Sequence, residues 1–105
     1  METSFYTHAK TNVVIHRSAL NRYSQAITFR SEKAKQVYGV IDQLLASNPH
    51  CVDWDDKPPG DVADLFHPGD SVVLYGCYLG MCLSVAAGAL ENKGVAVSFS
   101  SDDCF

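Results

Sequence analysis

The stretch that decides the fold is the last third of the chain, residues 69–105, GDSVVLYGCYLGMCLSVAAGALENKGVAVSFSSDDCF. An apolar run at 72–75 ends in the Gly-Cys pair 76–77, and the small apolar residues beyond the next turn predict a helix over about 81–92. A second apolar run, 95–99, predicts another strand. Because sites in open α/β sheets lie at the carboxyl ends of strands, we expect chemistry where the first of these strands ends.

Hydrophobic patterning predicts further elements upstream of this unit. They are strands over 12–16, 25–30 and 51–54, a loop over 17–24, a helix over 31–46 that Ser31 caps, and a helical turn over 61–66. This alternation predicts a small layered α/β domain, with a mixed, partly parallel sheet of about four strands flanked by two main helices. Residues 1–105 are expected to form one domain, of which the polar residues 1–11 are loosely held.

Composition narrows the class of protein. A hydrophobic content of 47% argues against a disordered chain, and a net charge of -4 with scattered cations argues against a nucleic-acid partner. No run approaches the roughly 20 apolar residues that span a bilayer, so no membrane association is expected. The first ten residues lack a charged-then-apolar signal pattern, so we expect a cytoplasmic protein with reduced thiols at Cys51, Cys77, Cys82 and Cys104.

Cys77 is the first candidate for chemistry, because it stands between a strand and the turn into the next helix. A thiol attacks as the thiolate, so a catalytic cysteine needs an exposed position and a lowered pKa. His16 ends the run 12–16 and would act as the base if the two strands are parallel neighbours. The alternatives are a buried, structural Cys77 and a His16 that closes its strand by hydrogen bonds to the following loop.

The motifs VVIH at 13–16 and LYGCYLG at 74–80 resemble those of the caspase-like (clan CD) cysteine peptidases. In that family a histidine ends one strand, and a Cys-x-x-Gly motif ends the next. The resemblance implies a caspase-like α/β fold, with His16 as the base and Cys77 as the nucleophile.

Cys82 carries a second resemblance. Gly76, five residues and then Cys82, followed by alanines up to Gly94, are similar to the C-terminal unit of the isochorismatase-like hydrolases. Their nucleophile lies on the first turn of the helix after a glycine-ended strand, where the helix dipole favours a thiolate. This resemblance implies that Cys82 is the nucleophile, and it also calls for an acidic base and a lysine. We see no aspartate on a predicted strand before residue 42.

Two functions remain open from the sequence. One is a cysteine-dependent hydrolase that uses Cys77 or Cys82 with His16. The other, which we favour, is a non-catalytic binding or self-associating module on a hydrolase-like scaffold. The small residues 86–89 of the predicted helix would let a second copy approach closely, so a homo-oligomer is expected, with a protein or a small molecule as a further ligand. No spacing typical of a metal site or a phosphate loop occurs, and no cofactor is predicted.

Overall fold

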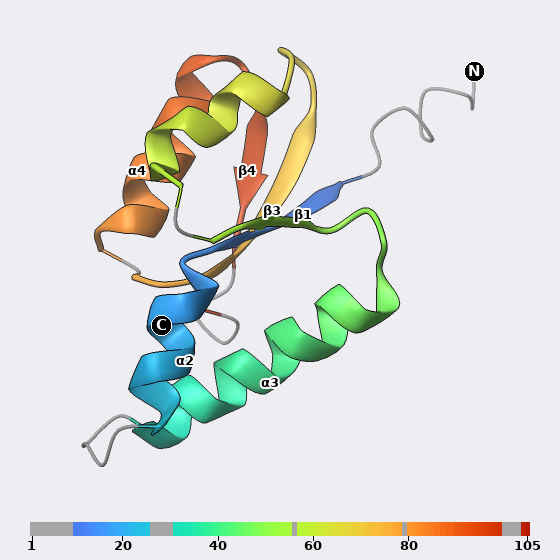
Figure 1. The fold of residues 1–105 in the computed structure, drawn as a ribbon. Helices are drawn as coiled ribbons and strands as arrows, with labels where there is room; N and C mark the ends of the chain where they lie inside the picture. Colours follow the sequence, from blue (N-terminus) through green and yellow to red (C-terminus); the bar gives the residue numbers. More distant parts are fainter. Residues whose placement is uncertain (1–9, 26–30, 56, 79, 100–103) are drawn as a thin grey trace.

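A parallel β-sheet lies at the centre of the fold in the computed structural model, which describes residues 10–25, 31–55, 57–78, 80–99 and 104–105 (Figure 1). Its strands are β1 (Thr11–Ile15), β2 (Val52–Trp54), β3 (Ser71–Gly76) and β4 (Ala96–Ser98), in the order β2-β1-β3-β4. Every pairing between these strands is parallel. The expected layered α/β domain with about four strands is confirmed, and its sheet is more uniform than the mixed one expected.

Helices cover both faces of the sheet. They are α2 (Arg17–Gln25), α3 (Ser31–Ser47), the 3-10 helix η1 (Pro59–Leu65) and α4 (Cys82–Asn92). Val14 faces the layer of α2 and α3, whereas Val13 and Ile15 face the layer of η1 and α4. This alternation follows from the period of two in a strand, and burial on both faces explains why β1 is apolar throughout its second half.

One predicted loop is a helix in the structure. Residues 17–24 were expected as a polar loop, and they form most of α2. The His16 carbonyl accepts the Leu20 N–H at 3.1 Å and so begins the helix, while Leu20 and Ser24 are its buried residues. The strand expected over 25–30 is wrong at Gln25, which ends α2; residues 26–30 lie outside the described part of the chain. The other predicted elements agree with the structure to within two residues.

Two glycines with positive φ lie in the last βαβ unit, one after α4 and one at the end of β3. Gly94 (φ 91°) ends α4, where its N–H donates to the Glu91 carbonyl and the Val95 N–H donates to the Leu90 carbonyl. These are the two bonds of a Schellman motif. Gly76 (φ 117°) ends β3, and a Cβ there would lie 2.0 Å from the Ile15 carbonyl oxygen. Only glycine lets β3 leave the sheet so close to β1.

Candidate functional site

The carboxyl edge of the sheet between β1 and β3 is a topological switch point. The chain leaves β1 toward α2 on one face and leaves β3 toward α4 on the other (Figure 1). Ligands of doubly wound sheets bind in the crevice at such a point. His16 and Cys77 directly follow the register pair Ile15 and Gly76, so the two predicted site residues do lie side by side. The Cys77 N–H also donates to the Ile15 carbonyl, at 3.3 Å.

The contact between His16 and Cys77 involves the backbone of the histidine. The Cys77 thiol donates to the main-chain oxygen of His16 at 3.5 Å. His16 has a left-handed backbone (φ 54°), and its carbonyl also accepts the Leu20 N–H. Its position is therefore that of the residue that caps α2. A base must reach the nucleophile with its imidazole, and the hydrogen bond that joins this pair does not use that ring.

Cys77 is buried in the same cluster as Phe105. The Phe105 N–H donates to the Gly76 carbonyl at 2.8 Å. The ring of Phe105 lies 4.7 Å from that of Tyr23 and 6.4 Å from that of Tyr78, measured between centroids. The side chain of Cys77 is 0% exposed. Cys77 therefore lacks the exposed position that a catalytic thiol needs, and its burial agrees with the structural alternative.

Burial also sets the protonation state of Cys77. It raises the pKa of the thiol to about 12, and the nearby thiols of Cys82 and Cys104 act in the same direction. The thiol is thus the stable form, and its hydrogen bond to a carbonyl oxygen uses the proton that a nucleophile must lose. The assignment of Cys77 as nucleophile stays a prediction, but the structure supplies neither the exposure nor the lowered pKa that it requires.

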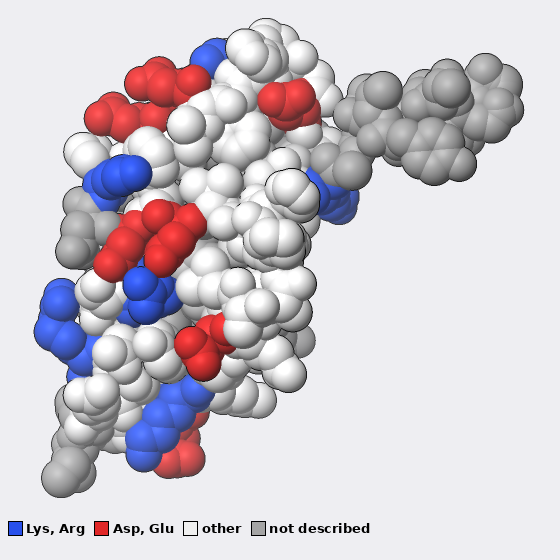
Figure 2. All heavy atoms as spheres, turned by 45° about the vertical axis from the view of Figure 1, so that its right-hand side comes forward, with Lys and Arg blue, Asp and Glu red and all other residues white. Residues whose placement is uncertain are grey.

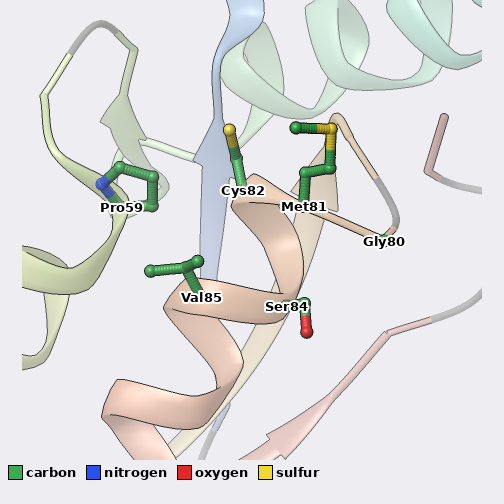
Figure 3. A pocket seen from close by; sticks show the side chains of 6 residues that line it. All are labelled: Pro59, Gly80, Met81, Cys82, Ser84 and Val85. Carbon is green, nitrogen blue, oxygen red and sulfur yellow. The ribbon is translucent and has the colours of Figure 1, made fainter.

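Cys82 lies in a different environment. It is the first residue of α4 and is half-buried, and it lines a hollow of about 450 Å³ between the start of η1 and the start of α4 (Figure 3). The residues that line the hollow are Pro59, Gly80, Met81, Cys82, Ser84 and Val85. Met81, which directly precedes α4, and Val85 on α4 are 66% and 54% exposed. Sequence reasoning missed this hollow.

The described residues that line the hollow are apolar apart from one hydroxyl and one thiol. Among them there is no His, Asp, Glu, Lys or Arg. A cysteine nucleophile requires an adjacent base, and the resemblance that favoured Cys82 calls for an acid and a lysine as well. The hollow therefore offers a surface for apolar groups, with Cys82 and Ser84 as its two polar contacts.

A polar network that the sequence did not reveal lies at the other side of the switch point. The Asp55 carboxylate accepts the Ser18 N–H at 2.6 Å and a short hydrogen bond from the Ser18 hydroxyl. Arg17 pairs with Asp53 at 3.0 Å. Partial burial raises the pKa of Asp55, but the two bonds from Ser18 and the charges of Arg17 and His16 outweigh it and lower the pKa overall.

This network occupies a position where an anion could otherwise bind. The first turn of a helix attracts anions because its N–H groups lack partners and its dipole is positive there. In α2 the chain's own Asp55 fills that role. The sequence signal for this contact is Arg-Ser directly after β1, because the first turn of a helix suits an acidic partner from elsewhere in the chain.

The small residues of α4 serve packing within the chain. Ala86 is buried, and Ala87 and Ala89 pack against the same cluster, which includes Val62 and Ala63 of η1. The small side chains of Ala86, Ala87 and Ala89 let α4 pack closely against this cluster. The expected homo-oligomer stays a prediction.

The described residues contain no group of three or more His, Cys, Asp or Glu side chains that could hold a metal ion. Within the same ranges, no helix is both long and apolar enough to span a bilayer. The face of the molecule in Figure 2 carries acidic and basic side chains side by side, without a broad patch of one sign.

Comparison with protein-family models, curated proteins and solved structures finds no match to this chain. The resemblances to caspase-like peptidases and to isochorismatase-like hydrolases therefore stay predictions. The fold and the two environments around Cys77 and Cys82 are the basis for any statement about function.

Proposed function

We propose that this chain is a non-catalytic binding module that holds an apolar group in the hollow between η1 and α4. The observation that carries the proposal is the hollow itself, which is about 450 Å³ in volume and has the exposed side chains of Met81 and Val85 in its lining. That volume lies within the range of roughly 300 to 1,000 Å³ typical of ligand sites.

The state of Cys77 supports a binding role over a catalytic one. The buried thiol of Cys77 donates to a backbone carbonyl and packs in the core, which agrees with the structural alternative for this residue. The switch point then acts as a rigid frame, and the hollow beside it is the accessible part of the carboxyl edge.

The second candidate function is a cysteine-dependent hydrolase with Cys82 as nucleophile. The position of Cys82, on the first turn of α4 after a glycine-ended strand, favours it. A hydrolase of this kind would lose its activity in a Cys82→Ala variant and keep it in a Cys77→Ala variant that folds. Equal turnover of an activated ester by the Cys82→Ala variant and the wild type would end this candidate.

Self-association remains part of the proposal. The strands β2 and β4 are the two edges of the sheet, and each has only three residues. Exposed edges favour pairing with another chain, although short strands limit it. Sedimentation over a wide concentration range measures this directly. A concentration-independent monomer would remove self-association and leave the hollow as the binding site.

A neutral apolar probe tests the binding function. We expect indole, titrated into ¹⁵N-labelled protein, to shift the amide signals of residues 60 and 80–85. The Val85→Asn variant should lose these shifts because it places a polar amide in the lining. Val40→Asn is the matched control, since Val40 is also an exposed valine on a helix, 39% exposed on α3. Shifts spread evenly over the chain, or equal losses in both variants, would contradict the proposal.

A further inference from the structure

We propose that Met81 is a site of reversible oxidation, and that its sulfoxide form binds apolar groups in the hollow much more weakly. This inference rests on the proposed binding function and names a way to regulate that same site. The oxidant is a peroxide, and the product is methionine sulfoxide. Met81 directly precedes α4 and lines the hollow, so a change in its side chain changes the lining itself.

Met81 carries the most accessible sulfur in the described part of the chain. It is 66% exposed, and Figure 3 shows its side chain rising from the start of α4 on the same side as that of Cys82. The cysteines are less accessible, because Cys77 and Cys104 are buried and Cys51 and Cys82 are half-buried. A peroxide in solution therefore reaches the thioether of Met81 more readily than these thiols.

Two backbone hydrogen bonds hold Met81 at the start of α4 independently of its sulfur. Its N–H donates to the Tyr78 carbonyl at 3.0 Å, and its carbonyl accepts the Val85 N–H at 2.9 Å. Met81 belongs to neither of the two buried clusters of the described residues. An oxygen added to its sulfur therefore disturbs no core packing there, and the fold should persist while the hollow changes.

The oxidation needs no base in the hollow. A lone pair of the thioether sulfur attacks one oxygen of the peroxide, a sulfur–oxygen bond forms, and the oxygen–oxygen bond breaks. The sulfur is oxidised by two electrons, and the proton of the transferred oxygen passes to the departing one, which leaves as an alcohol or as water. A thiol reacts instead as the thiolate, so a mildly acidic solution favours the thioether. For the reversal, two thiols of a methionine sulfoxide reductase act as the reductant; they form a disulfide, and water is released.

A sulfoxide at Met81 makes the hollow polar. It replaces a flexible apolar group by one with an exposed oxygen that accepts hydrogen bonds. The polar groups of the described lining are the Ser84 hydroxyl and the Cys82 thiol, and Figure 3 shows the Ser84 hydroxyl pointing away from the Met81 sulfur. An apolar ligand brings no donor of its own, so it would remove the new oxygen from water without a full replacement for the lost hydrogen bonds.

The test measures the binding of N-methylindole before and after oxidation of the full chain. This probe lacks the N–H that indole could donate to the sulfoxide. The ¹⁵N-labelled protein is treated with hydrogen peroxide at about pH 5, and mass spectrometry of the Met81 peptide follows the added oxygen. We expect the dissociation constant, taken from the amide shifts of residues 80–85, to rise at least about tenfold. Reduction by a methionine sulfoxide reductase with dithiothreitol should restore the first value.

Two variants show which sulfur is responsible. Met81→Leu keeps the lining apolar and has no sulfur at this position, so its dissociation constant should agree within about twofold before and after treatment. Met1, the other methionine of the chain, is still present in this variant and serves as an internal control. Cys82→Ser removes the neighbouring thiol and should still respond to the peroxide as the wild type does. A response that persists in Met81→Leu, or that disappears in Cys82→Ser, would overturn the inference.

The outcomes for the two proposals differ. If N-methylindole shifts the amides around the hollow in the untreated protein and complete oxidation of Met81 leaves its dissociation constant unchanged, the binding function stands and this inference is refuted. If no such shifts appear before treatment, both proposals fall.

Discussion

The protonation and burial of Cys77 make a quantitative prediction about its reactivity. The pKa of an ordinary cysteine is 9.0, and that of Cys77 is raised to about 12. At any pH well below 9, raising the pKa of a thiol from 9 to about 12 lowers the fraction of thiolate about a thousandfold. Because alkylation requires the thiolate, Cys77 in the folded protein should react with iodoacetamide at least about a thousandfold more slowly than an unstructured thiol.

The assay is native-state alkylation at about pH 8, followed by mass spectrometry of the cysteine-containing peptides. Cys82 is the internal comparison, because it is half-buried and lines the open hollow. We expect Cys82 to be modified while Cys77 stays free, and all four cysteines to react alike in denaturant. A Cys77 that reacts within about tenfold of Cys82 in the folded state would refute the reasoning.

The same pKa shift predicts a loss of stability in alkaline solution. A group whose pKa is raised by folding stabilises the native state below its ordinary pKa, and this contribution disappears as the pH rises toward the raised value. For Cys77 that window lies between about 9 and 12. The free energy of unfolding should fall more steeply there in the wild type than in Cys77→Ser, whose hydroxyl does not ionise in this range. If the free energy of unfolding falls equally with pH in the two proteins, the raised pKa of Cys77 is contradicted.

Three further predictions concern the backbone and the cap of α2. Gly76→Ala should lower the free energy of unfolding by about 3 kcal/mol or more, because the added Cβ meets a carbonyl oxygen at 2.0 Å. Gly39→Ala in α3 should instead raise the free energy of unfolding by up to about 1 kcal/mol. Chemical denaturation measures both changes. His16→Gly should be more stable than His16→Ala by about 1 kcal/mol, because φ is 54°, and the reverse order would refute a left-handed residue there. The lowered pKa of Asp55 means that its bonds with Ser18 stabilise the fold above the ordinary pKa of an aspartate and are lost as the pH falls through the lowered value. The melting temperature of Asp55→Asn should therefore fall less than that of the wild type as the pH is lowered. Equal decreases in the two proteins would argue against a stabilising contact between Asp55 and Ser18.

The last βαβ unit could be predicted from sequence because its signals are local. The apolar run of β3, the glycine that follows it and the small residues of α4 lie within one stretch, and each has its own period or turn. The helix α2 could not be predicted in the same way. Its sequence RSALNRYSQ is polar, and its cap comes from Asp55, 37 positions from Ser18.

The candidate site was half predictable for a similar reason. The apolar runs predict that His16 and Cys77 each end a strand, and the pairing of those strands as parallel neighbours, which the hypothesis required, is what the structure adds. The cluster in which Cys77 is buried includes Phe105, which returns to Gly76 at the very end of the chain. Such a long-range contact leaves no periodic signal, so the sequence could not distinguish a reactive thiol from a core residue.

The hollow lies between η1 and α4, and only the contribution of α4 has a signal in the sequence. The apolar residues at positions 81 and 85 lie one helical turn apart on the side of α4 that faces away from the core. A helical wheel would have shown them as exceptions to the buried stripe of α4. Pro59 completes the lining from η1, and its position follows from the packing of η1 on α4.

Intermolecular nuclear Overhauser effects from bound indole show directly whether the hollow between η1 and α4 is the binding site. If the hollow is the binding site, the indole protons should show effects to the methyl groups of Met81 and Val85 and none to those of Val40. Effects to Val40, or none to the two methyl groups of the hollow under conditions in which indole is bound, would contradict the account.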